Sequence, residues 1–280
     1  MHLVMVLAGL IIAWFVRTRY TELTSNIWGQ RWRLALFTFL FPPLLILMTA
    51  VALVCMGPQG KMGNWQTGCL GYVLALIYLI ISCILLIKLA WKGWQLVKTV
   101  RECPVVNITG KQIRLLDTEA LFAGQIGFWQ PELVLSYGLI QNLDEIHLES
   151  VLAHEQGHYY YRDTFWFFWL GWMRNCSAWL PNTDALWQEL LVLRELRADA
   201  RAALQVDPLI IAESLLIVVS SQSISEDIFC AAVDTGGSNR LEQRIEALLS
   251  PAQSTPESSY QYWNLFLLAL SPLITVIFHY

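Results

Sequence analysis

The residues most able to do chemistry in this sequence are the two histidines and the glutamate of the run His154-Glu155-Gln156-Gly157-His158. The surrounding stretch 143–164 has an apolar side and is predicted to be a helix capped by Asn142. One helical turn places His154 and His158 on the same face, where two imidazoles can hold one Zn²⁺ with Glu155 beside the bound water. This spacing predicts a metal-dependent peptidase, and ordinary histidines on a helix are the alternative.

A catalytic zinc site takes a third protein ligand and leaves one position for water. Glu195 is the best candidate for that ligand, and Glu189 is its main competitor. Asp199 lies one helical turn after Glu195, so it can hydrogen-bond a ligand histidine while Glu195 reaches the metal. Asp163, five residues past His158, can play a similar part or cap the helix that follows.

These residues predict hydrolysis of a peptide bond. Zinc polarises the scissile carbonyl and lowers the pKa of a water, and Glu155 takes the proton of that water and passes it to the leaving amine. A donor for the developing oxyanion could come from Tyr159, Tyr160 or Arg197, and the sequence does not choose among them.

Two segments ahead of the histidines predict short strands in a small sheet. The stretches Gln112–Glu119 and Ala120–Leu135 contain apolar residues interrupted by Gly124, Gly127 and Pro131. A strand just before the metal helix could receive an extended substrate by strand addition. A sheet that only covers the helices is the alternative.

The composition indicates a membrane protein. Hydrophobic residues make up 56% of the chain, charged residues only 14%, and there are 13 Trp. Four apolar segments are predicted to be transmembrane helices, at about 3–16, 34–56, 70–90 and 263–280. We therefore expect three spans in residues 1–91, a polar α+β domain in residues 92–260 and a fourth span in residues 261–280.

The distribution of basic residues predicts how the chain is oriented. Residues 17–33 contain four arginines, whereas residues 57–69 contain only Lys61. Because cytoplasmic loops are enriched in Lys and Arg, the domain 92–260 is expected to face the cytoplasm. A net charge of −4 without a basic block argues against nucleic acid as a direct partner.

The apolar stretch Phe165–Leu180 could be mistaken for a fifth span. Asp163, Arg174 and Asn175 flank or interrupt it, and a span here would separate the two halves of the metal site across the membrane. We expect a helix that lies at the membrane interface or packs under the active site.

The order of these features resembles the BlaR/MecR-type antirepressor metallopeptidases, which are gluzincins. The resemblance covers nearly the whole chain and rests on His154, Glu155, His158, Asp163, Trp179 to Asn182, Glu195 and Asp199, with a looser match at Gly124 to Leu135. It implies a zinc peptidase of the bacterial cytoplasmic membrane that cleaves a cytoplasmic regulatory protein, with a transcriptional repressor as a candidate. The antibiotic-sensing members carry an external penicillin-binding domain after the fourth span, and this sequence ends at Tyr280.

Other classes remain open at this point. Membrane peptidases of the HtpX and CAAX-processing type share both motifs and would imply quality control or protein processing. Site-2-type proteases need a later Asp-Gly ligand segment within an apolar span, which this sequence lacks. A non-catalytic scaffold with structural zinc would not require Glu155. Expected partners are the lipid bilayer and a protein or peptide substrate. The sequence does not decide the oligomeric state, and a homodimer is one alternative.

Overall fold

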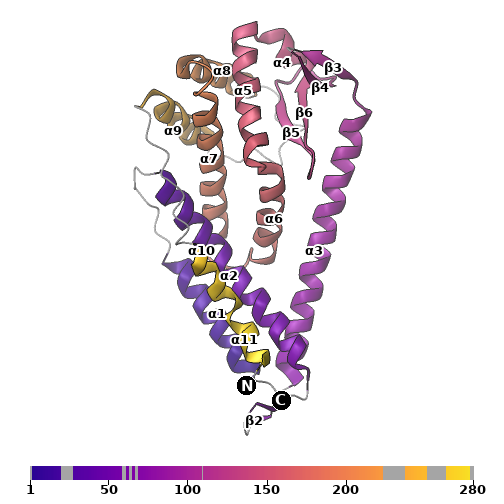
Figure 1. The fold of residues 1–280 in the computed structure, drawn as a ribbon, viewed down its shortest axis with the longest axis vertical. Coiled ribbons are helices and arrows are strands. Elements are labelled where there is room, and N and C mark those ends of the chain that lie inside the picture. Colours follow the sequence, from indigo (N-terminus) through magenta and orange to yellow (C-terminus); the bar gives the residue numbers. More distant parts are fainter. Residues whose placement is uncertain are drawn as a thin grey trace. The chain divides into compact units, whose positions relative to one another are not determined.

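The computed structural model describes residues 2–19, 28–58, 61–62, 65–66, 69–108, 110–222, 237–250 and 263–277. The chain is mainly helical with a small sheet, as predicted (Figure 1). The helices are α1 (His2–Thr18), α2 (Trp28–Met56), α3 (Cys69–Glu102), α4 (Tyr137–Asn142), α5 (Glu145–Tyr161), α6 (Asp163–Cys176), α7 (Thr183–Ala202), α8 (Pro208–Gln222), α9 (Gly237–Leu249), α10 (Trp263–Leu267) and α11 (Ser271–Ile277). The strands are β1 (Lys61–Met62), β2 (Trp65–Gln66), β3 (Val105–Ile108), β4 (Lys111–Leu116), β5 (Ala123–Ile126) and β6 (Glu132–Ser136).

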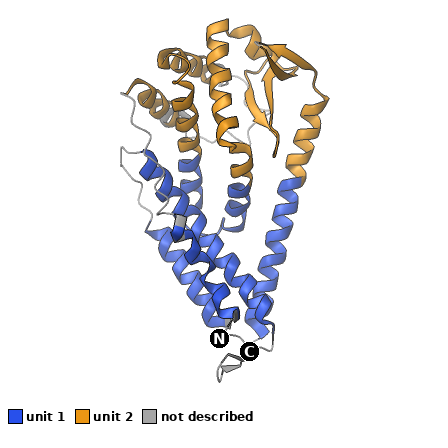
Figure 2. Ribbon diagram, viewed as in Figure 1, with its two compact units in different colours: residues 1–90, 169–190, 255–280 blue, residues 91–168, 191–254 orange. Residues whose placement is uncertain are grey.

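The chain divides into two compact units, which are coloured separately in Figure 2. Unit 1 consists of residues 1–90, 169–190 and 255–280, and unit 2 consists of residues 91–168 and 191–254. Helices α3, α6 and α7 each contribute to both units. The predicted polar domain 92–260 therefore includes a segment, 169–190, that packs within unit 1.

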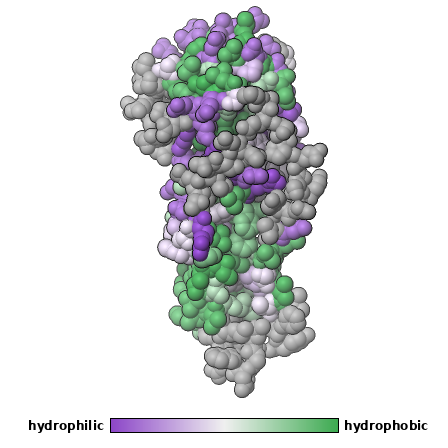
Figure 3. All heavy atoms as spheres, turned by 90° about the vertical axis from the view of Figure 1, so that its left-hand side faces the viewer, coloured by the Kyte–Doolittle hydropathy of each residue, from purple (hydrophilic) through white to green (hydrophobic). Residues whose placement is uncertain are grey.

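Unit 1 combines a buried helical core with an apolar surface. Phe39 and Leu53 of α2 are fully buried, and α1 and α11 both pack against α2. Large hydrophobic side chains of α1 and α3 are nevertheless exposed, among them Ile11, Trp14 and Ile80. In the space-filling view of one face, the side chains of unit 1 are mostly hydrophobic, whereas those of unit 2 are mixed (Figure 3). An exposed apolar surface of this extent is typical of contact with a membrane or another protein.

The prediction of four membrane-spanning helices is wrong for the described residues, where two helices, α2 and α3, are long and apolar enough to cross a membrane. Helix α1 has 17 residues, about 26 Å, which is less than the ~30 Å of a hydrocarbon core. The C-terminal segment is not one helix. It is divided into α10, a 3₁₀ turn (Leu268–Leu270) and α11. Pro272, the second residue of α11, has no N–H that could donate a hydrogen bond to the preceding helical turn.

The sheet of unit 2 has four strands in the order β3-β4-β6-β5. Strands β4 and β6 are parallel neighbours, and β3 and β5 are antiparallel to them. The prediction of a small sheet is confirmed, and β3 is an addition that the sequence reading missed. Ile113 and Leu135 of the two central strands pack on Leu152 of α5 in a shared core, which holds the sheet against the helix that carries the histidines.

Helix α5 begins later than predicted. Its N-cap is Asp144, whose carboxylate accepts a hydrogen bond of 2.9 Å from the backbone N–H of His147. Asn142 instead ends α4 and donates its amide to the carbonyl of Gly138. The prediction of Asn142 as cap was wrong because a carboxylate two residues later also satisfies the free N–H groups and carries the negative charge that a helix N-terminus favours.

The helices after α5 follow the predicted pattern. Most of the apolar stretch Phe165–Leu180 lies in α6, which ends at Cys176. The Pro181-Asn182 break, with Asn182 in the left-handed conformation, precedes the long helix α7. The apolar run 207–219 and the charged segment Arg240–Leu249 are also typical of helices, and α8 and α9 occupy these two segments. The polar stretch 250–259 is typical of a linker, and after position 250 it lies outside the described residues.

Candidate metal centre

Two imidazole nitrogens face each other on α5. The Nε2 atoms of His154 and His158 are 3.1 Å apart, and both side chains are largely buried. Two nitrogens bound tetrahedrally to zinc at 2.0–2.1 Å lie about 3.3 Å from each other. The spacing of the two nitrogens therefore fits a shared metal ion.

Glu195 of α7 completes a group of three ligand atoms. Its Oε2 lies 3.4 Å from Nε2 of His154, and its Oε1 lies 3.7 Å from Nε2 of His158. All three ligand atoms lie within 4.8 Å of one another. Two imidazoles and one carboxylate are the donor set of a catalytic zinc site that keeps a position for water, so the residues fit this metal.

A carboxylate lies behind each histidine. Nδ1 of His154 is 2.8 Å from Oδ1 of Asp199, and Nδ1 of His158 is 2.7 Å from Oδ2 of Asp163. A proton on each Nδ1 then faces a carboxylate, which leaves the Nε2 lone pairs directed at the shared position. Both acids are almost fully buried, so each holds its imidazole in one orientation.

A left-handed residue brings Asp163 to its histidine. Arg162 caps the end of α5 with φ 53°, and its backbone N–H donates to the carbonyls of His158 and Tyr159. The chain therefore turns sharply, and α6 starts at Asp163 beside the last turn of α5. Arg197 of α7 donates to the second oxygen of Asp163, which links the acid to the helix that carries Glu195.

Arg244 of α9 holds the other backing acid. Its Nε and Nη2 donate to the two oxygens of Asp199 at 2.7 and 2.8 Å, and its Nη1 lies 3.5 Å from Glu195. Arg194 donates to Oε1 of Glu195 at 2.9 Å. Bidentate arginine–carboxylate pairs fix geometry as well as charge, so Asp199 is held between His154 and Arg244.

The charges of this cluster favour a cation. Four acids (Glu155, Asp163, Glu195 and Asp199) face three arginines (Arg194, Arg197 and Arg244), so one negative charge is in excess when the histidines are neutral. A divalent ion at the shared position would convert this excess into a single positive charge. The net charge of the cluster would therefore change from −1 to +1, and its magnitude would stay at one.

Burial and pairing shift the pKa values of the central groups. Burial disfavours the charged form of His154, but Asp199 and Glu195 outweigh it and raise its pKa to about 10. Burial works against ionisation of Glu195 as well, yet Arg194 and the two histidines hold its pKa well below the usual range. Glu195 is therefore a carboxylate, and a metal must displace protons from the imidazoles in order to bind.

The side chain of Glu155 on α5 is also buried, with an exposed fraction of 6%. Its backbone carbonyl accepts a hydrogen bond of 3.3 Å from Nε2 of Gln125 on β5. Within the described chain its Oε2 is buried without a hydrogen-bond partner. A buried carboxylate oxygen with unused acceptor capacity is suited to receive a proton from a water molecule.

The other candidates lie elsewhere or are already engaged. Glu189, the competitor for third ligand, forms two hydrogen bonds with Arg31 of α2 within unit 1. Arg197 is paired with Asp163. Tyr159 and Tyr160 are both more than half exposed. The structure thus brings together His154, Glu155, His158, Asp163, Glu195 and Asp199.

Sequence reasoning did not identify Arg244 or Gln125. Arg244 lies 45 residues after Asp199, on a helix noted only for its charge. Nothing in the local pattern distinguishes it from a solvated arginine, and the single available signal was that a buried acid such as Asp199 requires a cationic partner.

Comparison with known proteins tests the class of this centre. No curated protein and no solved structure matches the sequence. One family model does match, over residues 105–210, a range that includes the sheet, the histidine helix and the whole of α7. Residues 105–210 match the model described as peptidase family M48, which indicates a metallopeptidase domain in this part of the chain.

Proposed function

We propose that this chain is a membrane-embedded zinc endopeptidase that hydrolyses a peptide bond in a cytoplasmic regulatory protein. The observation that carries the proposal is the convergence of three ligand atoms, from His154, His158 and Glu195, with the buried carboxylate of Glu155 next to His154 in the sequence of α5. A purely structural zinc site needs no such carboxylate, whereas a hydrolytic site needs a general base.

His154, His158 and Glu195 would hold the metal. Zinc bound there supplies a Lewis acid that polarises a carbonyl and lowers the pKa of a water. Glu155 then takes a proton from the attacking water and returns it to the nitrogen of the departing amine. Asp199 and Asp163 act on the histidines, because each fixes the proton at Nδ1 and the orientation of the ring.

The sheet supports an extended substrate. Strand β5 stands at one end of the strand order, so its outer backbone groups have no strand partner among the described residues. The side chain of Gln125 on this strand reaches the carbonyl of Glu155. A peptide that pairs with β5 would therefore run along the helix that carries the catalytic residues.

An aromatic cavity next to Gln156 and Tyr159 of α5 supports a preference for apolar side chains near the cleavage site. It has a volume of about 340 Å³ and includes Phe128, Trp129, Tyr160 and Phe165 in its wall. Pockets lined in this way bind apolar groups through buried area, and polar groups at the rim fix their orientation.

The lipid bilayer is the proposed setting. Helices α2 and α3 are long and apolar enough to span it, and exposed hydrophobic side chains on α1 and α3 support contact with lipid. The arginines of residues 17–33 favour a catalytic domain on the cytoplasmic side of a bacterial inner membrane. A repressor as substrate rests on the resemblance to the BlaR/MecR-type peptidases.

The test is a comparison of the proteins cut in cells that carry the wild-type chain or Glu155→Gln. New protein N-termini that occur only with the wild type would identify the substrate. We expect a cytoplasmic regulator among them and intact regulator in the variant. Identical sets of N-termini in the two strains would refute the proposal, and misfolded membrane proteins as the substrates would favour quality control of the HtpX type.

A further inference from the structure

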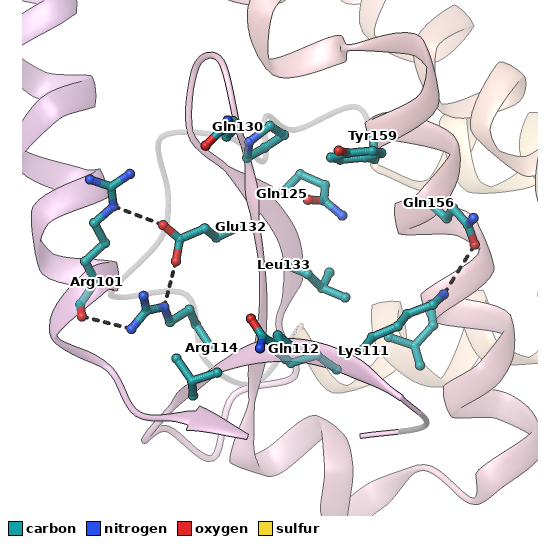
Figure 4. Close-up of a pocket in the computed structure, with 14 residues that line it drawn as sticks. Arg101, Lys111, Gln112, Arg114, Gln125, Gln130, Glu132, Leu133, Gln156 and Tyr159 are labelled. Atoms are coloured by element: carbon teal, nitrogen blue, oxygen red, sulfur yellow. Dashed lines mark hydrogen bonds and ion pairs between the residues drawn. The ribbon is translucent and has the colours of Figure 1, made fainter. Parts of the chain in front are cut away.

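A second cavity of unit 2 lies between the sheet and α5. It has a volume of about 570 Å³, and Figure 4 shows the residues that line it. Its floor is apolar and comes from Ile113 on β4, Leu133 on β6 and Leu152 on α5. The volume falls in the range of sites that hold a small ligand, so the cavity has room for more than one amino-acid side chain.

The cavity adjoins the catalytic turn of α5. Gln125 of β5 lines it and also donates to the backbone carbonyl of Glu155. Gln156, which follows Glu155, and Tyr159, which follows His158, form the facing wall (Figure 4). A peptide that runs along β5 past Glu155 would therefore place neighbouring side chains at this cavity.

The lining of the cavity is positively charged. Arg101, Lys111 and Arg114 stand against one acid, Glu132, so two positive charges are in excess. Glu132 accepts from both arginines, at 2.9 and 2.7 Å, and Arg114 chiefly lowers the pKa of this carboxyl. The arginines are thus oriented toward Glu132 (Figure 4).

Lys111 is the cation of the lining that has no carboxylate partner among the described residues, whereas Arg101 and Arg114 share Glu132. Its Nζ donates to the amide oxygen of Gln156 at 3.3 Å. An ammonium group has three donors, so Lys111 can hold a second acceptor while it keeps Gln156. Glutamine amides from Gln112, Gln125 and Gln130 add further donors to the lining of the cavity.

We propose that this cavity is a specificity site that binds an acidic segment of the substrate, with Lys111 as the residue that recognises its carboxylate. The inference rests on the proposed peptidase function and adds the charge of the preferred substrate. A carboxylate would replace solvent at Lys111 and form a charge-assisted hydrogen bond with its ammonium group, beside the apolar floor of the cavity.

The test measures binding, so that it does not depend on cleavage. The full chain with zinc and Glu155→Gln is titrated with fluorescein-labelled short peptides that are identical except for a central Glu-Glu, Gln-Gln or Lys-Lys pair. We expect the Glu-Glu peptide to bind about tenfold more tightly than Gln-Gln, and Lys-Lys to bind most weakly. The preference should decrease as salt increases.

Lys111→Glu brings the net charge of the lining to zero and should abolish the preference for the Glu-Glu peptide, whereas Lys98→Glu, an equal change of charge at an exposed position of α3 outside the cavity, should preserve it. Equal binding of the three peptides, or a preference that survives Lys111→Glu, overturns the inference. Acid-selective binding without cleavage by the wild type would refute the peptidase and leave the binding site. Cleavage by the wild type together with equal binding of the three peptides would support the peptidase and refute the site for an acidic segment.

Discussion

Gly157 of α5 lies so close to Ala198 of α7 that a Cβ atom on the glycine would stand 3.1 Å from the Cα and the carbonyl oxygen of Ala198. Ala198 is fully buried at this crossing. The two helices that carry His158 and Glu195 therefore pack almost backbone to backbone, which brings their ligand atoms within reach of one metal ion.

Gly157→Ala should push α5 and α7 apart. We expect a loss of about 1–3 kcal/mol in the free energy of unfolding, because an added methyl in a packed interface forces backbone shifts. Zinc affinity should fall with it, as the ligands separate. Gly93→Ala is the matched control, since a Cβ on this helical glycine meets nothing within 4 Å. Thermal unfolding and zinc titration of both variants provide the measurements, and unchanged zinc affinity in Gly157→Ala would contradict the account.

Arg244→Ala should weaken metal binding although Arg244 is not a proposed ligand. It leaves the buried carboxylate of Asp199 without its cationic partner, and we expect zinc affinity to drop roughly 10–100-fold. Arg244→Lys keeps the charge but not the bidentate geometry, so it should restore the affinity only in part. Arg240→Ala on the same helix is the control, and an equal loss in this variant would show that the effect is not specific to Asp199.

The contrast between His158 and Arg244 shows what the sequence could predict about the centre. The spacing of four residues on one helix places two imidazoles together by local geometry alone, so the pair could be inferred before the fold was known. Glu195 could be proposed because a zinc site requires a third ligand. The contact of Arg244 with Asp199 depends on how α9 packs against α7, and no local pattern encodes that.

The fold, like the metal centre, was predictable from the sequence only in part. The small sheet was predictable from apolar runs broken by glycine and proline, whereas β3 was missed because Val105–Ile108 is short and mostly exposed. Helix α3 was expected to end near residue 90, where the apolar run stops. It continues to Glu102, because Lys92, Lys98 and their neighbours are compatible with a solvated helix and nothing there terminates it.

The N-terminal cap of α5 should make stability depend on pH. Nδ1 of His147 is 2.6 Å from Asp144, its Nε2 is 3.3 Å from Glu213 of α8, and these acids raise the pKa of His147 above 6.5, with Asp144 as the main cause. A pKa raised by folding stabilises the protein below about pH 6.5, and this contribution is lost as the pH rises through the folded value.

His147→Gln should therefore cost more stability at pH 6 than at pH 9. Chemical denaturation across this pH range, with Glu149→Gln as a control at an exposed position of the same helix, measures the difference. A cost that is constant across the range, or one that increases with pH, would show that the imidazolium does not bridge α5 and α8.

The proposed orientation in the membrane can be checked by labelling. In a background without the native cysteines, Leu204→Cys at an exposed position just after α7 should react with an impermeant thiol reagent only after the cells are permeabilised. Pro58→Cys, after α2, should react in intact cells. The opposite pattern would place the catalytic domain outside and would exclude a cytoplasmic substrate.

The ligand set is tested by the metal content of single variants. His154→Ala, His158→Ala and Glu195→Ala should each lose most of their zinc, because each removes one of three ligands. Glu189→Ala is the control, since Glu189 pairs with Arg31 in the structure. Full zinc in Glu195→Ala together with loss in Glu189→Ala would reassign the third ligand.

The most direct test of the account combines zinc content and turnover in purified Glu155→Gln. Glutamine keeps the size of the side chain but cannot accept a proton, so the variant should bind about one zinc per chain, like the wild type, and lose at least roughly 10²–10⁴-fold in peptide hydrolysis. Near-normal hydrolysis with normal zinc content would contradict the account, because the buried carboxylate of Glu155 would then have no part in the chemistry.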